Sequence, residues 1–152
     1  MKFLRCVGYL FFIGIASFLI GLLLPRKWFH ADKFPYCTAR WEDDGKFYNK
    51  IAIRKWKNKM PDMSRVCPFM TAKRIPSCPK SDDLELLVGE TCVAELTHVL
   101  LILGGIVCIW IWNTGGIVIC LLWTIGNIPF VIIQRYNRPA LCRLQAKLQQ
   151  KG

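Results

Sequence analysis

The chain has 152 residues, of which 53% are hydrophobic, and its formal net charge is +11. Its apolar residues gather in three long runs, which excludes an ordinary water-soluble domain. The basic excess lies beside those runs, where anionic lipid accounts for it, so the charge does not indicate nucleic acid binding. We predict an all-α integral membrane protein with three transmembrane helices plus amphipathic interfacial helices, forming a single membrane domain over residues 1–152.

The first apolar run covers residues 4–24. At about 1.5 Å per residue it is long enough to cross a hydrocarbon core of about 30 Å. Lys2 and Arg5 give it the basic start of a signal peptide. However, the run exceeds the ~7–15 apolar residues of a signal peptide and lacks an A-x-A cleavage site. We therefore expect a retained membrane anchor that ends at Pro25.

Residues 26–95 form the long polar segment of the chain. They contain 14 Lys and Arg and all 10 Asp and Glu, whereas the turn at residues 113–116 is uncharged. The positive-inside rule then places residues 26–95 and the basic tail, residues 135–152, in the cytoplasm. The sequence thus predicts a multi-pass protein of the cell membrane with its N-terminus outside.

Within this segment, residues 46–59 mix aromatic and aliphatic side chains with six lysines and arginines. Such a composition is typical of a short amphipathic helix lying on an anionic phospholipid surface. A solvated basic helix packed on the protein is the alternative. Residues 65–79 contain three prolines and are expected to be irregular.

Eight cysteines are present, but they do not indicate a disulfide framework. Three lie in apolar runs, and the other five fall in the part expected to face the reducing cytoplasm: Cys37, Cys67, Cys78, Cys92 and Cys142. No pair has C-x-x-C spacing, so a zinc site is not indicated.

A second long helix is expected to start at Ser81, where a serine precedes acidic residues in the first turn. It would run without a break into the second membrane span, residues 96–112. The third span covers residues 115–133. The tail from Pro139 has leucines at helical spacing and is predicted to form another interfacial helix.

A first polar cluster leads into the second span. Helix counting at about 100° per residue puts its members on one face; they are Glu90, Thr91, Glu95 and His98. Glu95 and His98 are three residues apart and should touch. A carboxylate beside an imidazole orients the ring, as a general base requires.

A second polar cluster closes the third span. Gln134 and Arg138 lie within about 20° of the direction of Asn127, with Arg135 and Asn137 nearby. Amides and arginines so close together predict a polar pocket, and the arginine fork suits a carboxylate or phosphate. If the two spans form an antiparallel hairpin, both clusters reach the same membrane face. Polar groups at such a face indicate function.

Other readings of these residues remain open. Arg135 and Arg138 can be plain interfacial anchors. The Glu-x-x-His pair is also a ligand motif of di-iron bundles, so Glu90, Glu95 and His98 could serve a metal-dependent hydrolase or oxidoreductase, although no second copy of the motif is present. A non-catalytic, lipid-binding membrane subunit is the third reading.

Several stretches together resemble the glycosyl-diaponeurosporenoate acyltransferase family. The motifs are Trp41-Glu42-x-x-Gly45-Lys46-x-Tyr48, Ile53-x-x-Trp56-Lys57-x-x-Met60-Pro61, Glu90-Thr91-Cys92-x-Ala94-Glu95-Leu96-x-His98, Asn127-x-Pro129 and Gln134-Arg135-Tyr136-Asn137-Arg138-Pro139. The chain departs from the expected pattern at Val93 and Ala140, where we expect arginines in the family.

The resemblance implies a membrane-embedded enzyme that moves a fatty acyl group onto a hydroxyl of a lipid-like or glycolipid-like acceptor. The expected catalytic residues are His98 as base, Glu95 as its orienting partner, and Glu90. The expected substrate-binding residues are Thr91, Asn127, Gln134, Arg135, Asn137 and Arg138. No cofactor and no metal are predicted, and the sequence does not identify the acyl donor.

Overall fold

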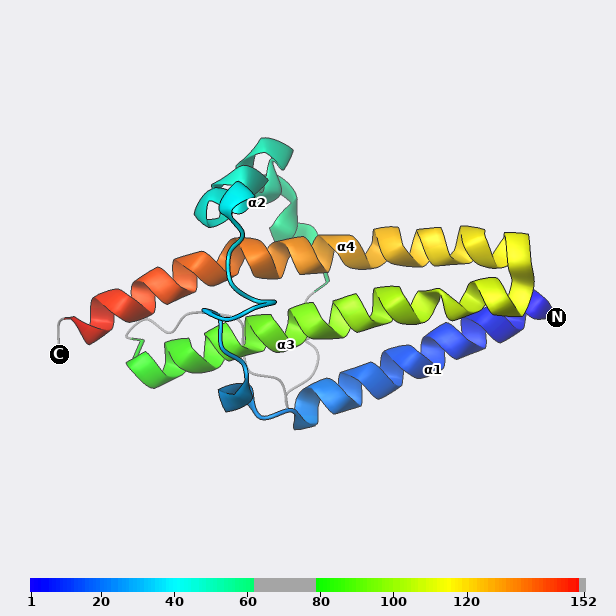
Figure 1. Ribbon diagram of the computed structural model, residues 1–152, viewed down its shortest axis with the longest axis horizontal. Helices are drawn as coiled ribbons and strands as arrows, with labels where there is room; N and C mark the ends of the chain where they lie inside the picture. The colour runs from blue at the N-terminus through cyan, green and yellow to red at the C-terminus, as the bar shows by residue number, and fades with distance from the viewer. Residues whose placement is uncertain (62–78, 151–152) are drawn as a thin grey trace. The chain divides into compact units, whose positions relative to one another are not determined.

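A computed structural model describes residues 1–61 and 79–150, which form helices and turns without a β-strand (Figure 1). Three helices are long and apolar enough to cross a membrane: α1 (Lys2–Leu23), α3 (Ser81–Gly105) and α4 (Val107–Gln149). The prediction of an all-helical membrane protein is therefore confirmed. Cys67 and Cys78, and the irregular stretch predicted around them, lie outside the described residues.

The chain divides into two compact units. We call residues 1–24 and 94–131 the apolar unit, and residues 25–93 and 132–152 the polar unit. Half of the most apolar 18-residue window of α3 is buried, against 11% for α1 and for α4. The outer two helices thus leave their apolar side chains exposed, as helices in contact with lipid do.

In the apolar unit, α1 packs along the second half of α3. A small core of Cys6 and Leu10 of α1 with Cys108 at the start of α4 lies beside this contact. The Tyr9 hydroxyl donates to the carbonyl oxygen of Gly104 at 3.1 Å, because a phenol removed from water needs an acceptor. Beyond Leu23 the backbone turns extended before Pro25, so α1 ends where the sequence predicts.

The chain reverses direction at Trp112 and Asn113, inside the stretch labelled α4 (Figure 1). Asn113 has φ 36° and ψ −117°, which breaks the helical path. After the reversal, Gly116 lies against the backbone of residue 108: a Cβ at Gly116 would be 1.9 Å from the carbonyl oxygen of Cys108. The predicted hairpin turn is confirmed, and it depends on a glycine that lets two backbones approach.

Helix α3 begins at Ser81 and continues through His98, as predicted. It ends at Gly105, so the helix breaks inside the predicted second span of residues 96–112 and resumes at Val107. The Asp83 carboxylate accepts a hydrogen bond from the backbone N–H of Lys80 at 3.0 Å. This contact fixes the start of the helix, where backbone N–H groups have no helical acceptor.

The prediction of a separate helix in the tail is wrong. Helix α4 continues through Pro129 and Pro139 to Gln149. A proline inside a helix loses one backbone hydrogen bond, and packing can offset that loss. Pro139 is buried, with its ring 3.8 Å from the position that a Cβ on Gly45 would occupy.

The predicted helix over residues 46–59 is also wrong. The structure has instead η2 (Arg40–Ile51), α2 (Ile53–Trp56) and η3 (Lys57–Lys59), preceded by η1 (Arg26–Trp28). Positive φ angles at residues 43–45 and at Ala52 interrupt the helical path. Gly45 has φ 86°, and a Cβ there would be 3.2 Å from the backbone oxygen of Tyr136, so η2 lies directly on α4. The alternative, a solvated basic helix packed on the protein, is wrong about the single helix as well, although the inner face of the segment does contact α4.

We predict that Gly116→Ala destabilises the hairpin, because the new methyl group cannot fit beside the Cys108 carbonyl. Gly126→Ala is the matched control: it lies on the same helix with nothing within 4 Å of the added methyl group. There, alanine should be neutral or stabilising by up to ~1 kcal/mol. Thermal unfolding of the detergent-solubilised protein measures both variants. Equal melting temperatures for the two would contradict the proposed close approach.

Candidate functional site

In the apolar unit, the structure joins His98 of α3 to Asn127 of α4. His98 Nδ1 lies 2.9 Å from Asn127 Oδ1. The Nδ2 group of the same asparagine donates to the backbone oxygen of Trp123 at 2.8 Å. Two residues chosen independently from the sequence therefore meet across the hairpin.

These two contacts determine which imidazole nitrogen carries the proton. A backbone carbonyl can only accept, so Asn127 must direct its NH₂ group toward Trp123 and its oxygen toward the ring. An amide oxygen also only accepts, so His98 Nδ1 must be the donor. In the neutral ring, Nε2 then holds the lone pair, which is the nitrogen a general base uses.

The His98 ring is further held by an aromatic neighbour. Phe130 stacks on it with centroids 4.6 Å apart and planes 7° apart. The Trp123 indole N–H donates to the backbone oxygen of Leu101 at 2.8 Å, which ties this part of α4 to α3. His98 itself is half-buried. The orientation of the imidazole on α3 is thus fixed by two residues of α4, Asn127 and Phe130.

Glu95 lies one turn before His98 on α3 and is 5% exposed. Burial of a carboxylate costs free energy unless polar groups contact it, so the position of Glu95 requires partners inside the protein. Its predicted contact with His98 stays a prediction. The partner that the structure gives to Nδ1 is Asn127, which the sequence assigned to substrate.

In the polar unit, Arg138 is 3% exposed and joined to Thr91. Its Nε donates to Thr91 Oγ1 at 2.9 Å, and one terminal nitrogen donates to the Thr91 backbone oxygen at 3.1 Å. The other terminal nitrogen donates to the backbone oxygen of Tyr36 at 2.8 Å. These two predicted site residues are therefore brought together, with Arg138 acting as a tie between α3, α4 and the segment that follows η1.

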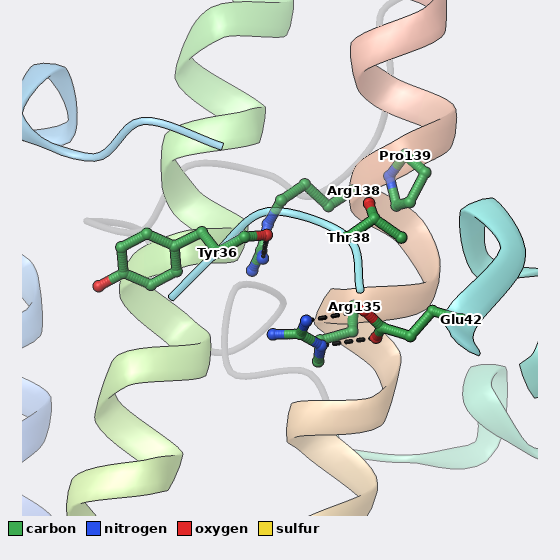
Figure 2. Close-up of a pocket in the computed structure, with 6 residues that line it drawn as sticks. All are labelled: Tyr36, Thr38, Glu42, Arg135, Arg138 and Pro139. Carbon is green, nitrogen blue, oxygen red and sulfur yellow. Dashed lines mark hydrogen bonds and ion pairs between the residues drawn. The ribbon is translucent and has the colours of Figure 1, made fainter. Parts of the chain in front are cut away.

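Arg135 makes a bidentate ion pair with Glu42 (Figure 2). The two N–O distances are 2.6 and 2.8 Å, and Glu42 is 1% exposed. The same guanidinium donates to the backbone oxygens of Pro35 and Cys37, each at 3.2 Å. The Glu42 carboxylate also accepts from Tyr48 and from the backbone N–H of Ala39.

These contacts outweigh the effect of burial on the acidity of Glu42. Burial alone would raise the pKa of its carboxyl, but hydrogen bonds from Arg135, Tyr48 and Ala39 lower that pKa below its ordinary value. Burial and the hydrogen bond to Glu42 raise the pKa of the Tyr48 hydroxyl, so it stays a donor. At neutral pH, Glu42 is therefore ionised and its ion pair with Arg135 is present.

The remaining predicted site residues of the polar unit also have places in this structure. Glu90 pairs with Arg26 at 2.8 Å, which fastens η1 to α3. Asn137 accepts from Lys57 Nζ at 3.0 Å, and Gln134 is 4% exposed. Catalytic and substrate-binding roles for these residues stay predictions.

Figure 2 shows Tyr36, Thr38, Glu42, Arg135, Arg138 and Pro139 around a small depression of the polar unit. The sequence did not single out Glu42 as a site residue, although it belongs to one of the motifs. Glu42, Gly45 and Tyr48 of that motif are all buried. Helical periodicity could not have identified Glu42, because φ is positive at residues 43–45.

Within residues 1–61 and 79–150, no group of three or more His, Cys, Asp or Glu side chains is arranged to hold a metal ion. The six cysteines in that part are free thiols: Cys6, Cys37, Cys92, Cys108, Cys120 and Cys142.

The fold and these polar groups define the class: an all-helical membrane protein in which a histidine on one helix is oriented by an amide on another. The family model described as glycosyl-4,4'-diaponeurosporenoate acyltransferase matches residues 25–147. Proteins of that name from Staphylococcus aureus strains bovine RF122 / ET3-1 and Newman are 32% identical to this chain. The protein from strain USA300 is 31% identical, and each comparison covers 97% of this chain and 90% of the relative.

The chain belongs to the glycosyl-4,4'-diaponeurosporenoate acyltransferase family, and it is an acyltransferase. The resemblance seen in its motifs is thereby confirmed. No solved structure matches the chain.

We predict that the Glu42 tie makes the protein acid-sensitive. Because the folded-state pKa is lowered, the stabilisation is fully present above the ordinary value of 4.5 and is lost as pH falls through the folded pKa. Glu42→Gln should cost about 3 kcal/mol near pH 7, and this difference from the unmodified protein should shrink below about pH 4.5. Thermal unfolding from pH 7 to pH 3 measures it.

Asp43→Asn is the control for that experiment, because Asp43 forms an exposed pair with Lys46 and should contribute under about 1 kcal/mol. A stability difference for Glu42→Gln that stayed constant down to pH 3 would show that the charge of Glu42 is not what holds the network.

Proposed function

We propose that the protein transfers a fatty acyl group onto a sugar hydroxyl of a glycosylated carotenoid-type lipid in the cell membrane. The family name supports the acceptor class, and the three apolar helices support a site open to membrane lipid. The single observation that carries the chemistry is the His98–Asn127 hydrogen bond, because it uses Nδ1 as a donor and leaves Nε2 as the ring nitrogen that would act as the base.

In this mechanism, His98 Nε2 accepts the proton of the acceptor hydroxyl as its oxygen attacks the acyl carbonyl. The protonated ring then returns the proton to the leaving group of the acyl donor. Asn127 does not touch the substrate; it is a positioning residue that holds Nδ1–H and so selects the reactive tautomer. Phe130 limits rotation of the ring by stacking on it.

Glu95 completes this part of the proposal. A buried carboxylate one turn from His98 would stabilise the imidazolium that forms when the ring accepts a proton. Thus two polar residues would support the base in different ways: Asn127 through the tautomer, and Glu95 through charge.

The arginines of the polar unit are assigned a supporting role. Their guanidinium groups donate to Glu42, Thr91 and backbone oxygens of residues 35–37. These contacts favour a role in holding the 35–48 segment against α4. A direct role of Arg135 or Arg138 in binding an anionic group of the donor stays a prediction.

We expect His98→Ala to lower product formation by about 10²–10⁴-fold, the usual contribution of a general base. The measurement is mass spectrometry of lipid extracts from cells with and without the gene, where the product differs from its acceptor by the mass of an acyl chain. His30→Ala is the control, because His30 is the only other histidine and is exposed. Retained product with His98→Ala, at normal protein level, would overturn the assignment.

Two substitutions test whether Asn127 acts as the hydrogen-bond acceptor for Nδ1–H of His98. Asn127→Asp keeps an oxygen acceptor for Nδ1–H and should retain most product formation. Asn127→Leu removes that acceptor and should lose about tenfold or more, since a wrong tautomer is a poor base. Equal activity of the two variants, with equal amounts of inserted protein, would refute the tautomer argument.

A further inference from the structure

The outer face of η2 carries a feature that the acyl transfer reaction does not use. Its inner face is fixed: Glu42 and Tyr48 are 1% and 4% exposed, and Glu42 is paired with Arg135 of α4. Arg54 and Lys57, which follow η2, also contact α4, through the Tyr136 hydroxyl at 3.1 Å and Asn137 at 3.0 Å. With one face held on α4, the opposite face of this segment has a defined direction.

That opposite face presents aromatic rings. Trp41 is 60% exposed and Phe47 is 36% exposed. Their centroids are 5.1 Å apart at an interplanar angle of 90°, and both rings also contact Tyr48 edge-on. The exposed pair is therefore braced from beneath by a buried ring, so it is a preformed surface rather than two independent side chains.

Cations surround these rings. Lys50 Nζ lies 5.4 Å from the Phe47 centroid, and Lys46 is exposed beside it. Residues 40–59 carry seven Lys and Arg against three Asp and Glu. All three acids are already paired with cations: Glu42 with Arg135, Asp43 with Lys46, and Asp44 with Arg143. Glu42 and Asp44 pair with arginines of α4, and the Asp43–Lys46 pair is exposed and 3.4 Å long, so it is weak and leaves the Lys46 ammonium group able to bind another anion.

Exposed tryptophan beside lysine is the combination that membrane interfaces favour, since the ring sits among headgroups and the ammonium group reaches phosphate. The segment is fastened to residues that closely follow a membrane span in the sequence. Arg135, the partner of Glu42, comes two residues after the third apolar run, residues 115–133. Anionic lipid also attracts juxtamembrane basic residues by ~1 kcal/mol each.

We propose that Trp41 and Phe47, flanked by Lys46 and Lys50, form a docking surface for anionic phospholipid headgroups. The rings enter the headgroup layer and the lysines bind lipid phosphate. Through this surface, η2 is held against the membrane while its Glu42 stays paired with Arg135. The inference does not depend on the proposed acyl transfer reaction.

The test uses the full chain in nanodiscs of phosphatidylcholine, with or without phosphatidylglycerol, that contain a shallow brominated lipid. The emission of Trp41 is obtained as the difference between the unmodified protein and Trp41→Phe, which keeps an aromatic ring at that position. We expect bromine to quench at least half of this emission in the anionic discs. Quenching should be clearly weaker in the neutral discs.

The charge contribution is measured with Lys46→Gln/Lys50→Gln, which should reduce the quenching of Trp41 in anionic discs at least twofold. Lys27→Gln/Lys33→Gln removes the same charge from an exposed stretch outside η2 and should leave the quenching unchanged. The proposal is overturned if Trp41 is unquenched by bromine and open to acrylamide in both discs. It is equally overturned if quenching is the same in neutral and anionic discs. Acyl transfer can persist or fail in either case, so the two proposals fail separately.

Discussion

A polar side chain removed from water must find its hydrogen-bond partner within the protein, and this constraint organises the polar interior of the molecule. In the part of the chain that the structure describes, every buried side-chain nitrogen or oxygen has a partner. Asn127 satisfies both ends of its amide, one on a ring nitrogen and one on a backbone oxygen. Glu42 satisfies its carboxylate with an arginine, a tyrosine and a backbone N–H. In each case the hydrogen bonds that satisfy the buried polar group also fix the orientation of the residues that form them.

The same constraint explains which parts of the fold could be predicted from the sequence. Long apolar runs, the uncharged turn and the serine at residue 81 act locally, so the spans, the reversal near Asn113 and the start of α3 follow from pattern alone. The course of η2 does not, because Gly45 adopts φ 86° in contact with Tyr136, a residue 91 positions away. The tail was mispredicted for a similar reason: burial of Pro139 against that distant segment allows α4 to continue through it.

The candidate site shows how far counting along one helix can go. It put His98 and Asn127 on the polar faces of their helices, where the structure joins them, because periodicity reports the direction of a side chain. Counting along one helix also favoured Glu95 as the partner of His98, since sequence spacing can only pair residues on the same element. The partner of Nδ1 comes from another helix, 29 residues away. Only the tertiary structure supplies that contact, and with it the choice of tautomer.

Two arginines of α4 donate hydrogen bonds to the backbone oxygens of three consecutive residues. Arg135 donates to Pro35 and Cys37, and Arg138 donates to Tyr36. Two guanidinium groups of α4 thus fix the path of this irregular segment, and they do so through its backbone oxygens rather than its side chains. Since every residue type offers the same carbonyl, the segment should tolerate substitution far better than it tolerates insertion or deletion. A lysine at either arginine position has a single nitrogen and could not donate to all of the acceptors that the guanidinium group contacts. The conformation of one stretch of chain is in this way encoded by the side chains of another, about a hundred residues later.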